Sequence, residues 1–214
     1  MPRIRTRVMG AGCRPATERS EKQLRAATSP YQTENIMTGQ ASPLAPLDGI
    51  FHRAVLPARL THVLDPPVPE SAGRYHRPGE PALYMSPYLD WARIAVSGYM
   101  REDGLPRLIV PLRVTGARVL DQRDARAMSK AQLDPTSSAH PWRPVLKEGG
   151  SPPSWALSDK ARALGANGLT DISRHIRGGW HLVLFRWNED DSPRVRVSGP
   201  PVEVQPTLTG PKWG

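Results

Sequence analysis

The sequence predicts an α+β fold in which short helices cover a compact mixed sheet, and three observations support this. The 214 residues include 24 Pro and 18 Gly, which interrupt regular structure too often for long helices. Short apolar runs bounded by turn residues recur along the chain and are typical of strands. Two segments carry apolar residues at spacings of three and four, which indicates helices. With 38% hydrophobic residues, the chain is long enough for one domain with a core.

Residues 1–46 have no sustained hydrophobic period and few large apolar side chains. Such a composition buries too little surface to offset chain entropy, so we expect a disordered, basic N-terminal extension. Seven basic and three acidic residues fall in it, so it accounts for +4 of the formal charge of +9. Its Arg-rich start faintly resembles a transit peptide, although a tail outside the functional domain is the preferred interpretation. A further hypothesis is that translation starts at Met37.

The folded domain is expected over residues 47–206, with a flexible tail over 207–214. Its first strand is predicted at Gly49–Ala54, and a second, Ala82–Met85, follows a Pro-Gly turn. Ser86 is the expected N-cap of a helix that begins at Pro87 and ends near Met100. The apolar face of this helix is formed by Leu89, Ala92, Val96 and Tyr99.

The second half of the domain alternates between predicted strands and helices, with irregular chain over 134–153. A helix from Ser154 to Leu164 is expected to stop at Gly165. The other predicted elements are strands at Leu108–Leu112 and Ala117–Leu120, a helix from Asp121 to about Leu133, strands at Gly168–Ile172 and His181–Trp187, and an edge hairpin of Val195–Val197 and Val202–Val204.

Composition narrows the class of protein. A formal charge of +9 favours an anionic partner, such as a phosphate-bearing molecule, an acidic protein or nucleic acid. Nucleic acid is the least favoured of these, because the basic residues are dispersed and only two Phe are present for base stacking. Cys13 is the only cysteine, which excludes an intramolecular disulfide and a cysteine-built zinc site. No apolar run has membrane-spanning length, so we expect a cytoplasmic protein that does not enter a membrane.

Several common catalytic motifs are missing from the sequence. No His-Glu-x-x-His pattern is present, and we expect no metal site. The Gly-Ala-Gly fragment at 10–12 follows no strand, so it is not a dinucleotide fingerprint. There is neither a Gly-x-Ser-x-Gly elbow nor a phosphate loop. Standard hydrolase, NTPase and metalloenzyme functions are therefore disfavoured.

A set of polar residues remains. Arg53 ends the first predicted strand and Arg74 precedes the Pro-Gly turn. Tyr84 and Ser86 are on the next strand, and Ser173 follows a later one. Each one alone would be interpreted as a surface, core or turn residue. The segments that carry them resemble, in order and spacing, the RES domain family over about residues 47–206. The matching pieces are Phe-His-Arg at 51–53, Gly-Arg-Tyr-His-Arg-Pro-Gly at 73–79, Leu-Tyr-Met-Ser at 83–86, Asn-Gly-Leu-Thr-Asp-Ile-Ser-Arg at 167–174, and Trp-His-Leu-Val-Leu-Phe at 180–185.

This resemblance implies a compact fold related to ADP-ribosyltransferases, and a toxin that consumes NAD by hydrolysis, phosphorolysis or ADP-ribosyl transfer. It also implies an Xre-type antitoxin as partner. By motif position, Arg53 and Arg74 would bind NAD, and Tyr84 and Ser173 would be catalytic. Guanidinium groups suit the pyrophosphate of NAD because they form bidentate, charge-assisted hydrogen bonds.

The sequence departs from the family at one position. The family's Glu lies eleven residues after the strand Tyr, and this chain has Ala95 there. Cleavage of the nicotinamide–ribose bond builds positive charge on the sugar, which a carboxylate stabilises. Glu102, Asp90 and Glu80 are conceivable replacements, each with a solvated surface charge as the simpler interpretation. The alternative function is therefore a degenerate RES domain that binds NAD, ADP-ribose or a protein without catalysis. If the missing Glu is the only defect, Ala95→Glu should raise turnover.

Overall fold

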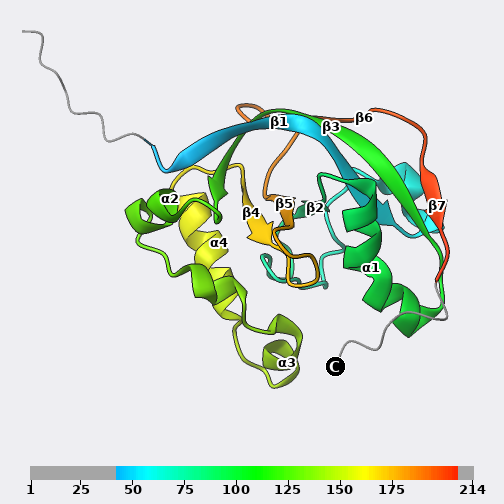
Figure 1. Ribbon diagram of the computed structural model, residues 1–214, viewed down its shortest axis with the longest axis horizontal. Coiled ribbons are helices and arrows are strands. Elements are labelled where there is room, and N and C mark those ends of the chain that lie inside the picture. The colour runs from blue at the N-terminus through cyan, green and yellow to red at the C-terminus, as the bar shows by residue number, and fades with distance from the viewer. Residues whose placement is uncertain (1–41, 207–214) are drawn as a thin grey trace, which may run out of the picture. The chain divides into compact units, whose positions relative to one another are not determined.

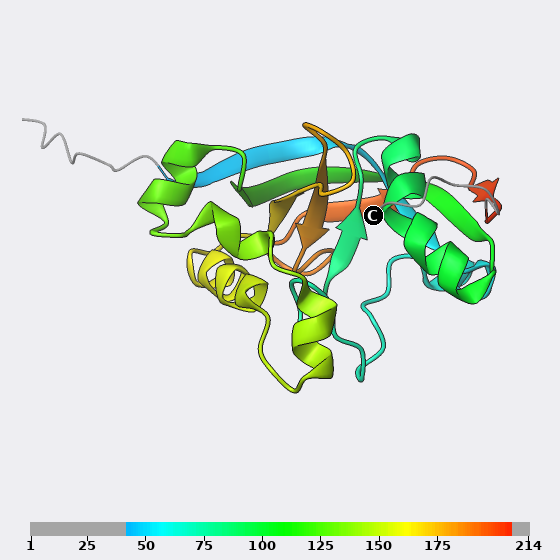
Figure 2. The same ribbon diagram turned by 60° about the horizontal axis from the view of Figure 1, so that its bottom comes forward.

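The computed structural model describes residues 42–206 (Figures 1 and 2). The expected disorder of residues 1–41 and the expected flexible tail at 207–214 lie outside the described residues. Strand β1 (Leu44–Val55) begins before the expected domain boundary at residue 47, so the prediction of disorder is wrong for residues 44–46. These residues are ordered because they pair with the end of β3 (Arg107–Asp121), as the register of Leu44 with Leu120 shows.

The sheet has seven strands and mixed pairing, which confirms the predicted α+β fold with short helices. Strands β1 and β3 form its long antiparallel pair. β3 is one continuous strand where the sequence predicted two. Gly116 lies where the pairing of β1 with β3 shifts register, and it has a positive φ of 76°. Its N–H donates to Oδ1 of Asp48 (2.5 Å), which lies at the register shift in β1. A bulge thus replaces the expected break.

The strand order is β1-β3-β4-β5-β2, and a bridge joins the chain just after the last strand of this order to the first strand. β4 (Gly168–Ile172) runs parallel to β3 and antiparallel to β5 (Trp180–Leu184), which pairs in turn with β2 (Leu83–Met85). Beyond β2, Ser86 and His52 exchange two backbone hydrogen bonds of 2.7 and 2.9 Å. The end of β2 is therefore tied back to β1, which fixes the segment that precedes α1.

The predicted edge hairpin is wrong. Strands β6 (Arg194–Val197) and β7 (Val202–Val204) both pair with β3 rather than with each other. β4 pairs with β3 only at residues 119–121. The earlier part of the same strand pairs with β6 at 112–115 and with β7 at 107–109.

Two longer helices flank the short strands. Helix α1 (Leu89–Asp103) and helix α4 (Pro153–Ala163) lie on either side of β4, β5 and β2 in both views (Figures 1 and 2). The N-cap of α1 is Tyr88, not Ser86, because Ser86 is held in the bridge to β1. The helix also runs past Met100 to Asp103, and Gly104, whose φ is 70°, is its C-cap.

Smaller helices occupy the segments between these elements. The helix expected from Asp121 is short, α2 (Ala125–Lys130), because Asp121 ends β3 and Asp124 caps the helix by accepting from the N–H groups of Arg126 and Ala127. The region expected to be irregular contains η2 (Pro135–Ser138) and α3 (Trp142–Lys147), and a further short helix, η1 (Pro57–His62), follows β1.

The apolar residues form two clusters on opposite faces of the central strands. Leu182 and Leu184 of β5 belong to a cluster with residues of β1, β2 and β3. Val183, between them in sequence, belongs to a second cluster with Tyr75 and residues of α2 and α4. Because side chains alternate along a strand, Asp171 of β4 shares the face of the second cluster.

Candidate functional site

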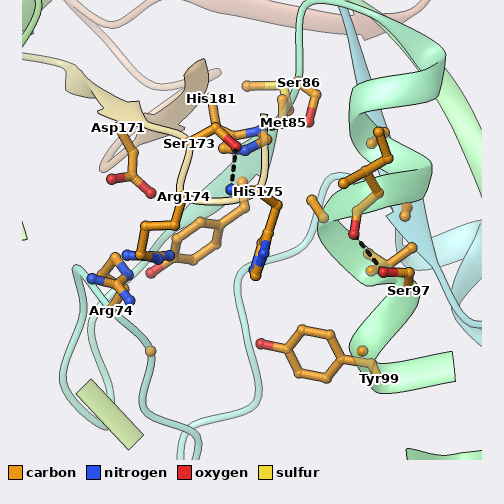
Figure 3. Close-up of a pocket in the computed structure, with 18 of the residues that line it drawn as sticks. Arg74, Met85, Ser86, Ser97, Tyr99, Asp171, Ser173, Arg174, His175 and His181 are labelled. Atoms are coloured by element: carbon orange, nitrogen blue, oxygen red, sulfur yellow. Dashed lines mark hydrogen bonds between the residues drawn. The ribbon is translucent and has the colours of Figure 1, made fainter. Parts of the chain in front are cut away.

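A cavity of about 500 Å³ lies beside this second face, within the range of small-molecule sites. Its lining comes from β1, the turn at 72–76, β2, α1, α3, the strands β4 and β5 and the segment that joins them. Figure 3 shows that side chains from these distant segments point toward one another. Of the predicted site residues, the cavity brings together Arg74, Tyr84, Ser86 and Ser173.

Arg74 lies in a tight turn in which the N–H of Gly73 donates to the carbonyl of His76 (3.0 Å). The start of α4 holds this turn, because Ser154 Oγ donates to the carbonyl of Arg74 (2.5 Å) and Trp155 Nε1 to that of Gly73 (2.9 Å). The Arg74 side chain is only 6% exposed. Its Nη1 donates to the carbonyls of Ser138 and, at 3.1 Å, His140.

The guanidinium of Arg174 shares a hydrogen-bond acceptor with that of Arg74. Nη1 of Arg174 donates to the same carbonyl of Ser138 at 3.2 Å, so two arginines converge on one oxygen. Burial lowers the pKa of Arg74, and the charge of Arg174 lowers it further, while Asp171 opposes both effects. Two cations held this close favour an anion between or beside them.

The hydroxyl of Tyr84 is part of the same turn. It accepts a hydrogen bond from the N–H of Tyr75 (3.0 Å) and lies 2.9 Å from Nδ1 of His76. Burial raises the pKa of Tyr84 and lowers that of His76 to about 4, so the phenol stays protonated and the imidazole neutral at neutral pH. Tyr84 therefore positions the turn that carries Arg74. Its catalytic role stays a prediction.

Ser173 follows β4, where the chain turns towards β5. Its N–H donates to the carbonyl of Gly179 (2.9 Å), and its Oγ accepts from the N–H of His175 (3.3 Å). The side chain is half-buried and faces the cavity beside His181 (Figure 3). The hydroxyl proton can thus be directed to a bound molecule.

Asp171 is the residue of the site that sequence reasoning missed. It is 6% exposed, lines the cavity, and its Oδ1 accepts from the hydroxyl of the fully buried Tyr75 (2.5 Å). Burial raises the pKa of Asp171, opposed by the hydrogen bond from Tyr75 and by the charges of Arg174 and Arg74. A sequence signal existed, because residue 171 lies on the predicted strand two positions before Ser173, and within that strand it shares a face with Leu169.

The buried Ser86 and the half-buried His181 form a further polar pair in the wall. Ser86 Oγ lies 2.8 Å from Nδ1 of His181, and both line the cavity. Burial lowers the pKa of His181 to about 4, with the charge of Arg174 acting in the same direction. His181 lies directly opposite Asp171 in the pairing of β4 with β5. The second face thus presents a carboxylate, an imidazole and a hydroxyl to the cavity.

Arg53 does not line the cavity, unlike its neighbours His52 and Ala54. Alternation along β1 turns it to the other face, where burial and Arg59 lower its pKa to about 10. Ala95 does line the cavity. The acids considered as replacements for the family's Glu are not among the lining residues: Asp90 pairs with Arg93, Glu102 with Arg143, and Glu80 with Arg77 and Arg162.

The lining is strongly cationic. Among the described residues it contains four arginines, Arg74, Arg101, Arg143 and Arg174, and a single carboxylate, Asp171. Residues 42–206 contain no group of three or more His, Cys, Asp or Glu placed to hold a metal ion. In the same part of the chain, no helix is long and apolar enough to cross a membrane. The site is therefore suited to an anionic ligand.

Comparisons with known proteins give the family. Curated protein sequences yield no match. Among solved structures, the crystal structure of the M. tuberculosis MbcT–MbcA toxin–antitoxin complex contains a similar chain, with a TM-score of 0.53 and 15% identity over 76% of this chain and 87% of that one. At this identity the likeness concerns the fold. The model of the RES domain matches residues 47–207, which is most of the sequence. The chain belongs to the RES domain family.

Proposed function

We propose that this protein consumes NAD by cleaving the bond between nicotinamide and ribose, and that water, phosphate or an acceptor molecule takes the ADP-ribosyl group. The observation that carries the proposal is the cavity of about 500 Å³ whose lining combines four arginines with one carboxylate. NAD has a pyrophosphate that needs cations, and a glycosidic bond whose cleavage needs a carboxylate near the sugar.

The convergent pair Arg74 and Arg174 is the proposed pyrophosphate site. Nη1 of each guanidinium donates to the carbonyl of Ser138, which orients both side chains before a ligand binds. Such preorganisation reduces the entropy lost on binding. Ser173, on the segment that carries Arg174, can donate to a ribose or phosphate oxygen. Tyr84 holds the turn of Arg74 in place through the N–H of Tyr75.

The test is incubation of the full chain with NAD, with loss of NAD and release of nicotinamide followed by chromatography. Arg74→Ala should lower turnover by about 10²–10³-fold, the usual cost of one preorganised electrostatic contact. Arg113→Ala is the matched control, since Arg113 is exposed on β3 and outside the cavity lining. Equal turnover by the wild type and Arg74→Ala would contradict the assignment of Arg74.

One observation favours a second function, binding without catalysis. Ala95 contributes a methyl group to the cavity wall on α1, and a methyl group cannot stabilise a cationic sugar. Titration calorimetry separates the two functions. Heat of binding for NAD or ADP-ribose with no release of nicotinamide would support the binder, whereas release of nicotinamide supports the enzyme. Neither heat nor release would remove both.

A toxin role with a protein antitoxin, of the Xre type, is part of the same proposal. Its support is the fold, which is shared with a chain of a toxin–antitoxin complex. Expression of the full chain in a bacterial host should then stop growth and lower cellular NAD. Coexpression of the protein encoded beside it should restore both. Normal growth at a high level of folded protein would contradict the toxin role.

A further inference from the structure

The proposed reaction places a chemical demand on the cavity wall. When the C1′–N bond breaks, its electron pair moves to the ring nitrogen of nicotinamide and the ribose acquires oxocarbenium character. The arginines of the lining oppose that cation. The described residues of the lining include one acidic side chain, Asp171.

We propose that Asp171 is the catalytic carboxylate of this site and faces the ribose of bound NAD, in place of an acid on helix α1. This inference rests on the proposed function and names the residue that performs its central step. Asp171 stabilises the cationic sugar while nicotinamide leaves. When water attacks C1′, its oxygen forms the new bond to carbon and the proton that it loses passes to the carboxylate or to solvent.

The position of Asp171 supports this role. Asp171 is part of β4, which pairs with β3 as far as Thr170, and it lies opposite His181 of β5, so the carboxylate is carried by a strand rather than a loop. The hydroxyl of Tyr75 binds Oδ1, and among the described residues no side chain donates to Oδ2. Figure 3 shows the carboxylate on the same side of the cavity as Arg174 and Arg74. One oxygen thus orients the group and the other is available to a ligand.

The neighbouring charges suit the same role. Arg174 and Arg74 both interact electrostatically with Asp171 and favour its charged form. In NAD the nicotinamide ribose is joined to the pyrophosphate through its 5′ oxygen and C5′, so a molecule whose pyrophosphate meets these arginines brings the sugar to the carboxylate at the edge of the same cluster. Ser173 lies two residues after Asp171 on the same face and completes the polar wall.

A purely structural role for Asp171, as the partner of Tyr75, makes different predictions. Asp171→Asn keeps the size of the side chain and an oxygen that accepts from Tyr75, but removes the negative charge. Tyr75→Phe removes the hydrogen bond and keeps the carboxylate. If Asp171 is catalytic, the first change lowers kcat strongly and the second does not. A purely structural pair would tolerate the first change, which keeps the hydrogen bond, and would lose activity in the second, which removes it.

The experiment measures release of nicotinamide from NAD by the full chain and these variants, with calorimetry for affinity and thermal melts for folding. Asp171→Asn should lower kcat by about 10²–10³-fold and change NAD affinity far less. Tyr75→Phe should stay within about tenfold of the wild type. Asp90→Asn, at a 74% exposed carboxylate of α1, is the control and should leave kcat unchanged. Adding Ala95→Glu to Asp171→Asn should recover part of the turnover.

The outcomes separate the inference from the proposed function. An active wild type with an equally active Asp171→Asn variant overturns the role of Asp171 and leaves NAD consumption standing. A loss in Tyr75→Phe that equals or exceeds the loss in Asp171→Asn also overturns it, in favour of a structural pair. If Asp171→Asn does not fold, Tyr75→Phe decides, since its retained turnover supports the carboxylate and its loss refutes it. A wild type that releases no nicotinamide removes the function and this role together.

Discussion

Gly73→Ala is expected to destabilise the protein and to disturb the turn that carries Arg74. A Cβ at this position would lie 2.3 Å from Cε1 and 2.6 Å from Nδ1 of His76, and 2.9 Å from the hydroxyl of Tyr84. The imidazole cannot move away at little cost, because it is 4% exposed and lies within hydrogen-bond distance of Tyr84. Overpacking costs about 1–3 kcal/mol and a lost buried hydrogen bond about 1 kcal/mol, so the free energy of unfolding should fall by about 2–4 kcal/mol.

Urea unfolding followed by the fluorescence of the six tryptophans measures this change. Gly98→Ala is the matched control, since a Cβ there meets only Arg101 Nη2 at 4.0 Å within helix α1. It should raise stability by about 0.5–1 kcal/mol, because alanine favours a helix over glycine. If Gly73→Ala unfolds at the same urea concentration as the wild type, the described packing of the turn is wrong.

Two further predictions concern stability. Folding lowers the pKa of His76 and of His181 from the ordinary 6.5 to about 4. Between these two pH values the unfolded chain binds more protons than the folded one. The stability of the fold therefore falls as the pH drops from 6.5 to 4. For His76 the loss of unfolding free energy is about 3 kcal/mol. Urea unfolding at pH 7 and pH 4.5 should show this loss, and the His76→Asn variant should lose less stability between the two pH values. An equal loss in the variant and the wild type would contradict the burial of His76 as a neutral ring. Arg77→Ala should lower the free energy of unfolding by only about 1 kcal/mol. Arg77 donates two hydrogen bonds of 2.6 and 2.7 Å to Asp159, but the pair is partly exposed. A loss above about 3 kcal/mol in the same assay would contradict this.

Sequence patterns predicted an element well where neighbouring residues alone determine its bounds. β4 has the bounds that the sequence predicted, and α4 stops before Gly165, whose φ is 77°. The signals failed where distant chain decided the outcome. Ser86 has the chemistry of an N-cap, but its pairing with His52 holds it in an extended bridge. Pairing of β6 and β7 with β3 likewise depends on which residues of β3 the other strands leave available.

The site was predictable only in part, for a similar reason. The motif order identified Arg74, Tyr84 and Ser173, and the fold brings all three to one cavity. Arg53 was expected there as well, but a strand exposes alternate faces and the sequence does not say which face of β1 meets the cavity. Asp171 was overlooked because its place on the predicted strand does not reveal the partner that holds it. Tyr75, which binds it, lies 96 positions earlier in the chain.

The central claim, that the cavity of Arg74, Ser173 and Asp171 cleaves NAD, is tested most directly by measuring nicotinamide release from NAD by the full chain. The account predicts one nicotinamide for each NAD lost, at a rate that Arg74→Ala reduces by about 10²–10³-fold and Arg113→Ala leaves unchanged. No release of nicotinamide by folded protein that binds NAD in calorimetry would contradict it, and would identify the cavity as a binding site alone.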